Sequence, residues 1–340
     1  MTNPTISLCI PTYNGGKYLA ETLDSVAAQT FDDFEVVIVD DCSTDDTVPI
    51  AERFVAGEPR ARLIRNTVRA GSSARNLARC VEESRGEWIK PLQQDDLITP
   101  DCLARMVEGG ARGPLVFAHH DYVFSPDTDA QVRHYYESLP TLGVELPVPY
   151  ATPDAACDAL LRNAWVNFIG SWSTSLIHRS CIEKYGIFHK TIIYFPDLEY
   201  WMRVGTNEGM SIVAERLSSY RVHGHSVSAR LRGDPLNDFR GGLDWVLLVY
   251  LVARDPRYAR FREFALRRDP PFDAEFAFMD QLNDWRFEAL EASYRGRDRT
   301  RLDTFNAFCE KNPAVRAALR DNDRQFPAWH RFKQFLKARV

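Results

Sequence analysis

The sequence predicts an α/β fold: a mostly parallel sheet flanked by helices, with a helical extension at the C-terminal end. Two observations support this prediction. Over the first 120 residues, short β-branched runs alternate with segments whose apolar residues recur at helical spacing. Such alternation is typical of a parallel sheet with helices on both faces. From Asp234 onward the apolar spacing is helical.

The expected elements follow one another regularly. Strands are predicted at Ile6 to Ile10, Phe34 to Val39, Arg62 to Ile64, Glu87 to Leu92 and Pro114 to Ala118. Helices are predicted between them, at Tyr18 to Val26, Thr47 to Ala56, Ser72 to Glu83 and from Pro100 onward. Residues 125–150 are polar and contain four prolines, so a loop is expected there. Periodic patterns resume at Asp154, and a boundary near Gly233 separates residues 1–233 from residues 234–340.

The composition is that of a soluble globular protein. Of the 340 residues, 45% are apolar and 26% are charged, which excludes a disordered or fibrous chain. The formal net charge of -5 argues against a protein held mainly on nucleic acid. The charge is uneven, because residues 1–229 carry 20 Lys and Arg against 30 Asp and Glu, whereas residues 230–340 carry 22 against 17. The two parts are therefore expected to meet different partners.

Cysteine usage and apolar runs predict a cytoplasmic protein. The seven cysteines are scattered singly without a Cys-x-x-Cys pair, which indicates reduced thiols rather than a zinc site or a disulfide framework. No basic segment followed by an apolar stretch opens the sequence, so a secretory signal is not expected. The longest apolar run, Trp245 to Ala253, has nine residues and is too short to span a bilayer as a helix.

Two polar turns follow the first two predicted strands. Pro11-Thr12-Tyr13-Asn14 closes the first strand, and Asp40-Asp41-Cys42-Ser43-Thr44-Asp45 closes the second. Because the carboxyl ends of parallel strands meet at one edge of a sheet, these turns are expected to form a crevice that binds a base and a ribose. The alternative is that Asp40 and Asp45 only begin the next helix, since Asp and Ser favour caps and turns.

A helix start after the third strand offers a second polar feature. Ala74-Arg75-Asn76 follows the flexible segment Ala70 to Ser73. Free backbone N–H groups at a helix start attract an anion, and Arg75 would add contacts to a base or a diphosphate. The alternative for Arg75 is a surface ion pair.

Adjacent carboxylates end the fourth strand. Gln93-Gln94-Asp95-Asp96 follows Leu92, and the repulsion between Asp95 and Asp96 would be relieved by a bound cation or by a helix start. Mg²⁺ or Mn²⁺, held by one or two carboxylates and by substrate phosphates, meets that need. The alternative is that Asp96 caps the helix near Pro100.

Two later segments carry further candidates. Asp197 near the start of a predicted helix suits a general base. Glu199 and Arg203 are spaced i to i+4, so a structural ion pair and a catalytic role both remain open. His223 and His225 follow the next strand and could bind a metal or a phosphate, although an exposed loop position is favoured for His225.

In their order, these segments resemble the family 2 glycosyltransferases of the GT-A fold. That family shows a P-T-Y-N turn, a V-D-D-x-S-x-D turn, an A-R-N helix start, an L-D-x-D-D strand end, an E-D-x-E-x-W-x-R helix and a Y-R-x-H-x-x-S segment. All six occur in order between Pro11 and Ser228, two of them with one substitution. Gln93 replaces the first Asp of D-x-D, and Pro196 replaces the Glu before the base. The tail from Asp234 matches nothing specific in the family.

The resemblance implies a GT-A nucleotide-diphospho-sugar transferase fold for residues 1–233, with a nucleotide-binding part at about 1–120 and an acceptor-side part at about 121–233. It implies Asp197 as the catalytic base, and Asp95 with His223 at an Mn²⁺ or Mg²⁺ ion. Contacts with the donor nucleotide are expected from Pro11, Thr12, Tyr13, Asn14, Asp40, Asp41, Arg75, Gln94, Asp95 and Asp96. Acceptor or supporting roles are expected for Glu199, Trp201 and Arg203.

The predicted activity is metal-assisted transfer of a sugar, with inversion, from a nucleoside-diphosphate sugar to an acceptor hydroxyl in cell-surface polysaccharide or glycan synthesis. One alternative, suggested by Gln93 and Pro196, is a catalytically silent module that only binds the donor. A sugar nucleotidyltransferase is another, but it needs a basic Gly-rich phosphate loop, and the first turn supplies only Lys17.

The expected partners are a nucleoside-diphosphate sugar and a glycan or lipid-linked acceptor, with no nucleic acid. The segment Arg331 to Arg339 mixes basic and apolar residues. It predicts either peripheral contact with the inner face of the membrane, or a helix that packs on its own domain or on a second subunit of a homo-oligomer.

Overall fold

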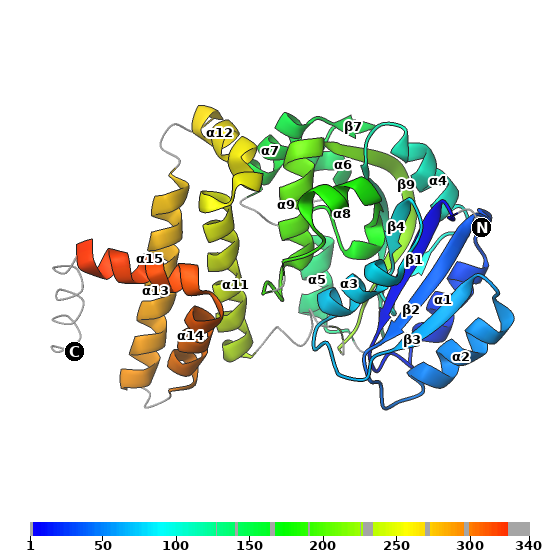
Figure 1. The fold of residues 1–340 in the computed structure, drawn as a ribbon, viewed down its shortest axis with the longest axis horizontal. Coiled ribbons are helices and arrows are strands. Elements are labelled where there is room, and N and C mark those ends of the chain that lie inside the picture. The colour runs from blue at the N-terminus through cyan, green and yellow to red at the C-terminus, as the bar shows by residue number, and fades with distance from the viewer. Residues whose placement is uncertain are drawn as a thin grey trace. The chain divides into compact units, whose positions relative to one another are not determined.

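The computed structural model describes residues 3–126, 128–139, 142–163, 167–189, 191–224, 226, 234–268, 273–295 and 299–325. The contacts between Cα atoms divide the chain into two compact units, residues 1–229 and 230–340 (Figure 1). The boundary expected near Gly233 and the histidine His225 lie outside the described residues.

The first unit alternates strands and helices along the chain. Its strands are β1 (Ile6–Thr12), β2 (Phe34–Asp40), β3 (Ala61–Arg65), β4 (Trp88–Pro91), β5 (Leu97–Ile98), β6 (Leu115–Phe124), β7 (Tyr150–Ala151), β8 (Ser175–His178) and β9 (Met210–Val222). Its helices are α1 (Leu19–Ala27), α2 (Thr47–Gly57), α3 (Ser73–Glu83), α4 (Cys102–Gly110), α5 (Ala130–Glu137), α6 (Leu142–Glu145), α7 (Pro153–Arg162), α8 (Arg179–Tyr185) and α9 (Pro196–Glu208), with a 3-10 turn η1 (Trp172–Thr174). The α/β fold predicted from the sequence is therefore confirmed.

The strands form one mixed sheet in the order β3-β2-β1-β4-β8-β6-β9-β5, with β7 paired to β9. The first four strands of this order are parallel, and β8 runs antiparallel to both β4 and β6. In the ladder of β1 and β2, Thr12 lies opposite Asp40. The polar turns after β1 and β2 therefore begin side by side at the carboxyl edge of the sheet, where open α/β sheets bind ligands.

Strands β1 and β2 give this edge a rigid base. Every residue of β1 and β2 is buried, because helices cover both faces of the sheet. Helix α1 buries Leu19, Leu23 and Val26 in the same core. The turns after β1 and β2 therefore begin at buried residues, which hold the start of each turn in place.

The segment 125–150 differs from the expected loop. It contains α5 and α6 and ends in β7. Asp129 caps α5, because its carboxylate accepts hydrogen bonds from the backbone N–H groups of Gln131 and Val132. Pro126 and Pro147 lie outside the helices, so the prolines of the segment separate short elements rather than exclude them.

The second unit is helical. It comprises α11 (Pro235–Arg254), a 3-10 turn η2 (Pro256–Tyr258), α12 (Ala259–Arg268), α13 (Ala274–Arg295), α14 (Thr300–Lys311) and α15 (Pro313–Gln325). Gly242 lets α11 approach α13 closely, since a Cβ at that position would lie 2.0 Å from the Trp285 ring. Among the described residues, no helix is long and apolar enough to cross a membrane.

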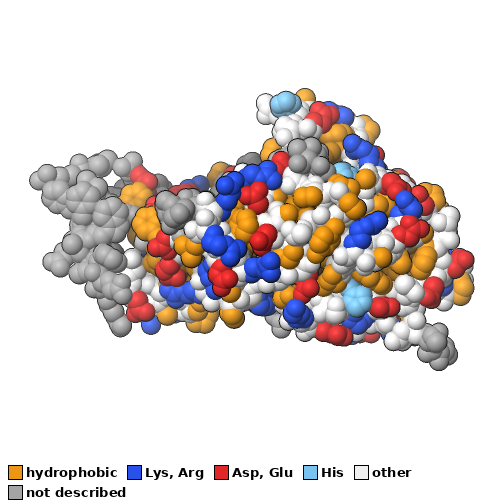
Figure 2. Space-filling view, turned by 90° about the horizontal axis from the view of Figure 1, so that it is seen from above, with side chains coloured by type: hydrophobic (Ala, Val, Ile, Leu, Met, Phe, Trp, Pro, Cys, Tyr) orange, Lys and Arg blue, Asp and Glu red, His pale blue; other side chains and the backbone are white. Residues whose placement is uncertain are grey.

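The surface charge and the C-terminal segment bear on the partners expected from the sequence. Figure 2 shows side chains of both signs interspersed with apolar ones on one face of the molecule. The segment Arg331 to Arg339, on which the membrane and oligomer alternatives depend, lies outside the described residues.

Candidate active site

The turn after β1 is held by the side chain of Gln94. The Tyr13 N–H donates to Gln94 Oε1 at 2.8 Å, and Gln94 Nε2 donates to the Tyr13 carbonyl at 3.1 Å. Gly15 leaves the space for this amide, since a Cβ there would lie 2.2 Å from Gln94 Oε1. Gln94 therefore acts on the backbone of the turn, and the partly exposed Tyr13 ring remains for a ligand.

Asp40 joins the turn after β1 to the turn after β2. Its Oδ1 accepts from Thr12 Oγ1 at 3.2 Å, and its Oδ2 accepts from the Ser43 N–H at 2.9 Å. Ser43 Oγ in turn accepts from the N–H of Asn14, which has a left-handed φ of 45°. Asp40 is only 2% exposed, so its carboxylate holds the two turns rather than facing solvent.

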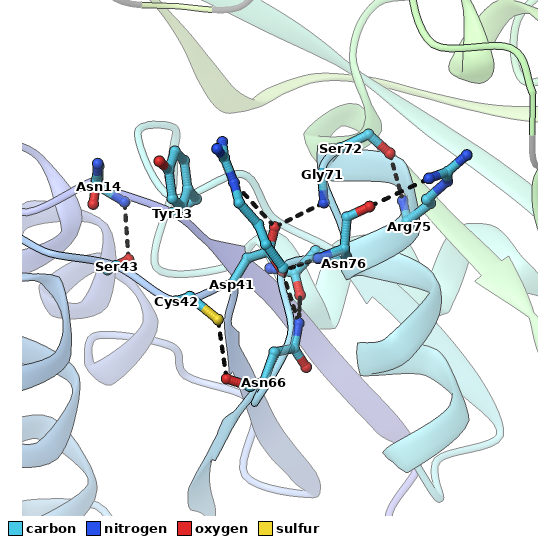
Figure 3. A network of polar contacts seen from close by, with 12 residues as sticks. Tyr13, Asn14, Asp41, Cys42, Ser43, Asn66, Gly71, Ser72, Arg75 and Asn76 are labelled. Atoms are coloured by element: carbon cyan, nitrogen blue, oxygen red, sulfur yellow. Dashed lines mark hydrogen bonds and ion pairs between the residues drawn. The ribbon is translucent and has the colours of Figure 1, made fainter.

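Asp41 organises the loop that leads into α3 (Figure 3). Its Oδ1 accepts from the Ala70 N–H at 2.5 Å and from Asn66 Nδ2 at 3.0 Å, and its Oδ2 accepts from the Gly71 N–H at 3.1 Å. Gly71 has φ +81°, which favours glycine.

The alternative that Asp40 and Asp45 only begin the next helix is wrong for Asp40, whose carboxylate binds Thr12 and Ser43. Asp45 does stand at the start of α2, where its Oδ1 accepts from the Thr47 N–H at 3.1 Å, and its Oδ2 also accepts from the Gly16 N–H in the turn after β1 at 2.9 Å.

Arg75 lies at the start of α3 and is exposed. Its backbone N–H donates to Ser72 Oγ at 3.2 Å, and its guanidinium donates to the Ala70 carbonyl at 3.4 Å. Figure 3 shows Tyr13 and Arg75 on opposite sides of Asp41. Arg75 and Tyr13 therefore reach different parts of this edge.

Arg69 is a feature that the sequence motifs missed. Its guanidinium carbon lies 3.7 Å from the centre of the Tyr13 ring, and its Nε lies 3.9 Å from Asp41 Oδ2. A guanidinium stacked on an aromatic ring offers a flat cationic surface. The only sequence signal for Arg69 is its position in the polar loop after β3.

Asp95 and His223 meet although they come from distant segments. Asp95 Oδ2 lies 2.9 Å from His223 Nε2, and the His223 ring lies 4.6 Å from the Tyr18 ring between centroids. The Asp95 side chain is 22% exposed and the His223 side chain 6%. A carboxylate oxygen is a suitable ligand for Mn²⁺ or Mg²⁺ if phosphate oxygens complete the shell, and an imidazole nitrogen beside it suits Mn²⁺ better than Mg²⁺, which prefers oxygen ligands.

The pair alone is not a complete metal site. Within the described ranges, no group of three or more His, Cys, Asp or Glu side chains is placed to hold a metal ion. Gln93, which stands at the first position of the expected D-x-D, turns toward α3, where its Oε1 accepts from Ser73 Oγ at 2.9 Å. The donor set therefore fits a cation that is bound together with a phosphorylated ligand.

Asp96 lies behind Asp95 and is 1% exposed. Its Oδ2 accepts from Ser173 Oγ at 2.5 Å, and its Oδ1 accepts from the Arg221 N–H at 3.0 Å. Burial and the neighbouring Asp95 carboxylate raise the pKa of Asp96 to about 7. The alternative that Asp96 caps the helix near Pro100 is wrong, since α4 begins at Cys102 and Asp101 precedes it. The expected donor contact is corrected as well, because the carboxylate is enclosed by protein donors.

A loop from residue 167 to residue 174 links this end of the site to Asp197. Ser173 binds Asp96, and Asn167 Nδ2 donates to Asp197 Oδ2 at 3.0 Å. Lys90 of β4, fully buried, holds the loop by donating to the carbonyls of Ser173 and Ser175. None of these loop residues was identified from the sequence, because the segment matches no motif and has no periodicity.

Asp197 stands in the first turn of α9 and is partly exposed. Burial of its carboxyl group raises the pKa of Asp197 to about 6, against the hydrogen bonds donated by the Leu198 N–H and by Asn167. At neutral pH the carboxylate is mostly ionised, and its basicity exceeds that of an ordinary Asp. These are properties of a general base.

Glu199, Trp201 and Arg203 lie inside the protein. Arg203 Nε donates to Glu199 Oε1 at 2.7 Å and Nη2 donates to Oε2 at 2.9 Å, with side chains 2% and 0% exposed. Arg203 also donates to the carbonyls of Tyr185, Gly186 and Ile187. Trp201 Nε1 donates to the Gly170 carbonyl at 3.3 Å. Burial leaves these side chains a supporting position around α9 and no contact surface for an acceptor.

The chain is similar to proteins of a known family. The model of Glycosyl transferase family 2 matches residues 7–185. An uncharacterized protein of Mycobacterium tuberculosis, MT1568, is 30% identical over 261 residues, which are 75% of this chain and 80% of that protein.

Two solved structures share the fold. Staphylococcus aureus TarS (residues 1–349) in complex with UDP-GlcNAc superimposes with a TM-score of 0.58 and 17% identity over 91% of this chain and 92% of that one. The mannosyltransferase PcManGT of Pyrobaculum calidifontis, in complex with GDP-Man and Mn²⁺, gives a TM-score of 0.54 and 19% identity over 95% and 88%.

Proposed function

Since the chain belongs to glycosyl transferase family 2 and is a glycosyltransferase, we propose that it moves a sugar from a nucleoside-diphosphate sugar to an acceptor hydroxyl, with inversion at the anomeric carbon. The observation that carries this proposal is the loop at 167–174. Ser173 of this loop binds Asp96, the neighbour of Asp95, and Asn167 of the same loop binds Asp197. This supports a proposal in which the pair of Asp95 and His223 and the base Asp197 serve one site.

The nucleoside of the donor binds at the turns after β1 and β2. The Tyr13 ring, with the Arg69 guanidinium stacked on it, offers a surface for a base, and Arg75 at the α3 start offers charge to a diphosphate. Asp40 and Asp41 keep the two turns in place through their buried hydrogen bonds. Donor structures of TarS and PcManGT support a nucleotide sugar as the ligand class.

Asp95 and His223 would hold an Mn²⁺ or Mg²⁺ ion together with the diphosphate. Such a cation, when bound, stabilises the negative charge that develops on the departing nucleoside diphosphate. The Mn²⁺ in PcManGT supports this proposal. Asp96, enclosed by Ser173 and Arg221, fixes the backbone that carries Asp95.

Asp197 accepts the proton of the acceptor hydroxyl as that oxygen attacks the anomeric carbon from the side opposite the leaving group. The raised pKa of Asp197 suits proton acceptance near neutral pH. Asn167 orients the carboxylate by binding Oδ2, and the Leu198 N–H binds Oδ1. Pro196 stands where the family has a Glu before the base, and in this chain Asn167 of the loop supports Asp197 instead.

The acceptor is a glycan of the cell surface in this proposal. The sequence of TarS is also a relative, 34% identical over 99 residues, and its name describes a poly(ribitol-phosphate) β-N-acetylglucosaminyltransferase. The matched part is 28% of this chain and 17% of that protein, and this sequence similarity supports a cell-surface glycan as the acceptor class.

Thermal unfolding with a panel of UDP-, GDP- and dTDP-sugars in the presence of Mn²⁺ tests the donor site. One nucleotide should raise the melting temperature, and chelation of the metal should reduce the shift. Asp95→Ala should lose the metal-dependent part, whereas Asp101→Ala, which changes an acid just before α4, should keep it. A shift that is equal in both variants would contradict the role of Asp95.

A further inference from the structure

A cluster of aromatic rings on β6, β9 and α5 is not used by the site described above. Its centre is Tyr122 of β6, whose ring centroid lies 4.9 Å from that of His120, 5.2 Å from that of Tyr136 and 6.1 Å from that of Tyr220. The ladder of β6 and β9 places Tyr122 opposite Tyr220, so both rings lie on one face of the sheet. Tyr122, Tyr220 and His120 are partly exposed.

His120 connects this cluster to the loop that orients Asp197. A Cβ on Gly170 would lie 3.0 Å from His120 Cε1 and 3.2 Å from His120 Nδ1, so the imidazole packs directly on Gly170. The Gly170 N–H and carbonyl are both bonded to the side chain of Asn167, and the same amide donates to Asp197 Oδ2. The imidazole and the base therefore flank one short turn.

The backbone at His120 is irregular. The ladder of β6 and β9 shifts its register between Ala118 and His119 and again between His119 and His120. Such irregularities re-aim a side chain and are frequent beside active sites. Gly170 has φ +107°, which favours glycine, so the surface that receives the imidazole also has a special backbone.

The chemistry of His120 suits an uncharged ligand. Burial, and then the neighbouring His119, lower the pKa of His120 to about 4, so the ring is neutral at pH 7. A neutral imidazole offers one donor and one acceptor. In the part of the chain that the structure describes, neither ring nitrogen of His120 makes a hydrogen bond, which leaves both for a ligand.

We propose that His120, Tyr122 and Tyr220 bind a neutral glycosyl residue of the acceptor and direct its reacting hydroxyl toward Asp197. A sugar ring has an apolar face that stacks on aromatic side chains and hydroxyls that both donate and accept, and the cluster offers both kinds of contact. The inference rests on the proposed function, because it names the acceptor class of the same site. His120 is an acceptor-binding residue in this account.

The test separates the donor from the acceptor. Donor affinity is measured by calorimetry, and donor hydrolysis is measured as release of nucleoside diphosphate in the absence of a sugar acceptor. Acceptor affinity is measured by saturation-transfer NMR with methyl glycosides of glucose, galactose, N-acetylglucosamine and mannose. His120→Phe keeps a ring but removes both nitrogens, and His120→Gln restores an uncharged donor and acceptor. His119→Phe is the matched control on the same strand.

His120→Phe should weaken binding of the preferred glycoside at least tenfold, and His120→Gln should recover part of the loss. Donor affinity should stay within twofold in both variants and in His119→Phe. The inference would be overturned by equal glycoside affinity in wild type and His120→Phe, or by an equal loss in His119→Phe. It would also be overturned by a wild type that hydrolyses the donor but binds no glycoside of the panel. A wild type that binds and hydrolyses no donor would instead overturn the proposed function.

Discussion

Replacing Asp197 with Asn should remove a pH-dependent cost of folding. In the folded protein the pKa of Asp197 is raised from 3.8 to about 6, so between these values the native state binds more protons than the unfolded chain. The stability of the wild type therefore falls as the pH rises through this window and levels off above pH 6. Asn resembles the protonated carboxyl and carries no such dependence.

The size of the effect follows from the two pKa values. A shift of that size makes the ionised carboxylate cost up to about 3 kcal/mol near pH 7.5, and roughly 1.6 kcal/mol at pH 5. Asp197 is partly exposed, so these values are upper limits. In Asp197→Asn the amide has one oxygen for the two donors, the Leu198 N–H and the Asn167 amide, so one donor would face the new NH₂ group. The lost hydrogen bond offsets about 1 kcal/mol of the gain in stability. The effect of the substitution should thus become more favourable by up to about 1.4 kcal/mol between pH 5 and pH 7.5.

Urea unfolding at both pH values, followed by a probe in the first unit, measures this difference. Asp154→Asn is a matched control, because α7 also begins with Pro and Asp and Asp154 is exposed. The control should show no gain with rising pH. If Asp197→Asn loses the same stability at pH 5 and pH 7.5, the carboxyl is not desolvated in the folded protein, and the assignment of a tuned base fails.

Two further predictions concern the supports of the site. Gly15→Ala would place a Cβ against Gln94 and break its hydrogen bonds with the turn after β1, so it should lower the free energy of unfolding by about 1–3 kcal/mol. Gly57→Ala is the control, because the space around Gly57 is open, and it should not lower this free energy. Equal melting curves of the two variants would contradict the prediction. Arg203→Met would leave the Glu199 carboxylate buried without its cation and should cost about 3–5 kcal/mol in denaturant unfolding; a loss below about 1 kcal/mol would indicate that Glu199 is not buried as an ion.

Much of the fold could be predicted because its signals are local. The apolar runs of β1 and β2 and the helical spacing between them predict the parallel part of the sheet. The register of Thr12 with Asp40 lies beyond the predicted strand ends, Ile10 and Val39, and is given by the structure. The segment 125–150 was predicted less well. Its proline content suggested a loop, but the cap at Asp129 allows a helix between the prolines.

The site could be predicted in its motifs but not in its connections. Asp95 and Asp197 stand in recognisable patterns, whereas the bond between Ser173 and Asp96 joins residues far apart in the sequence without any periodic signal. Likewise, the spacing of Glu199 and Arg203 allowed a structural ion pair or a catalytic role. Their burial decides between the two, and burial depends on how α8 and α9 pack rather than on the spacing.

The most direct test of the account is donor turnover by wild type and Asp197→Asn, measured together with donor affinity. With the nucleotide sugar that stabilises the protein, Mn²⁺ and a glycoside acceptor, wild type should release nucleoside diphosphate and form a product of inverted configuration. Asp197→Asn should bind the donor within about twofold of wild type but lose at least a hundredfold in turnover, in keeping with the loss of a general base. Turnover near the wild-type rate in Asp197→Asn, or a parallel loss of donor affinity and turnover, would show that Asp197 is not the base of this glycosyltransferase.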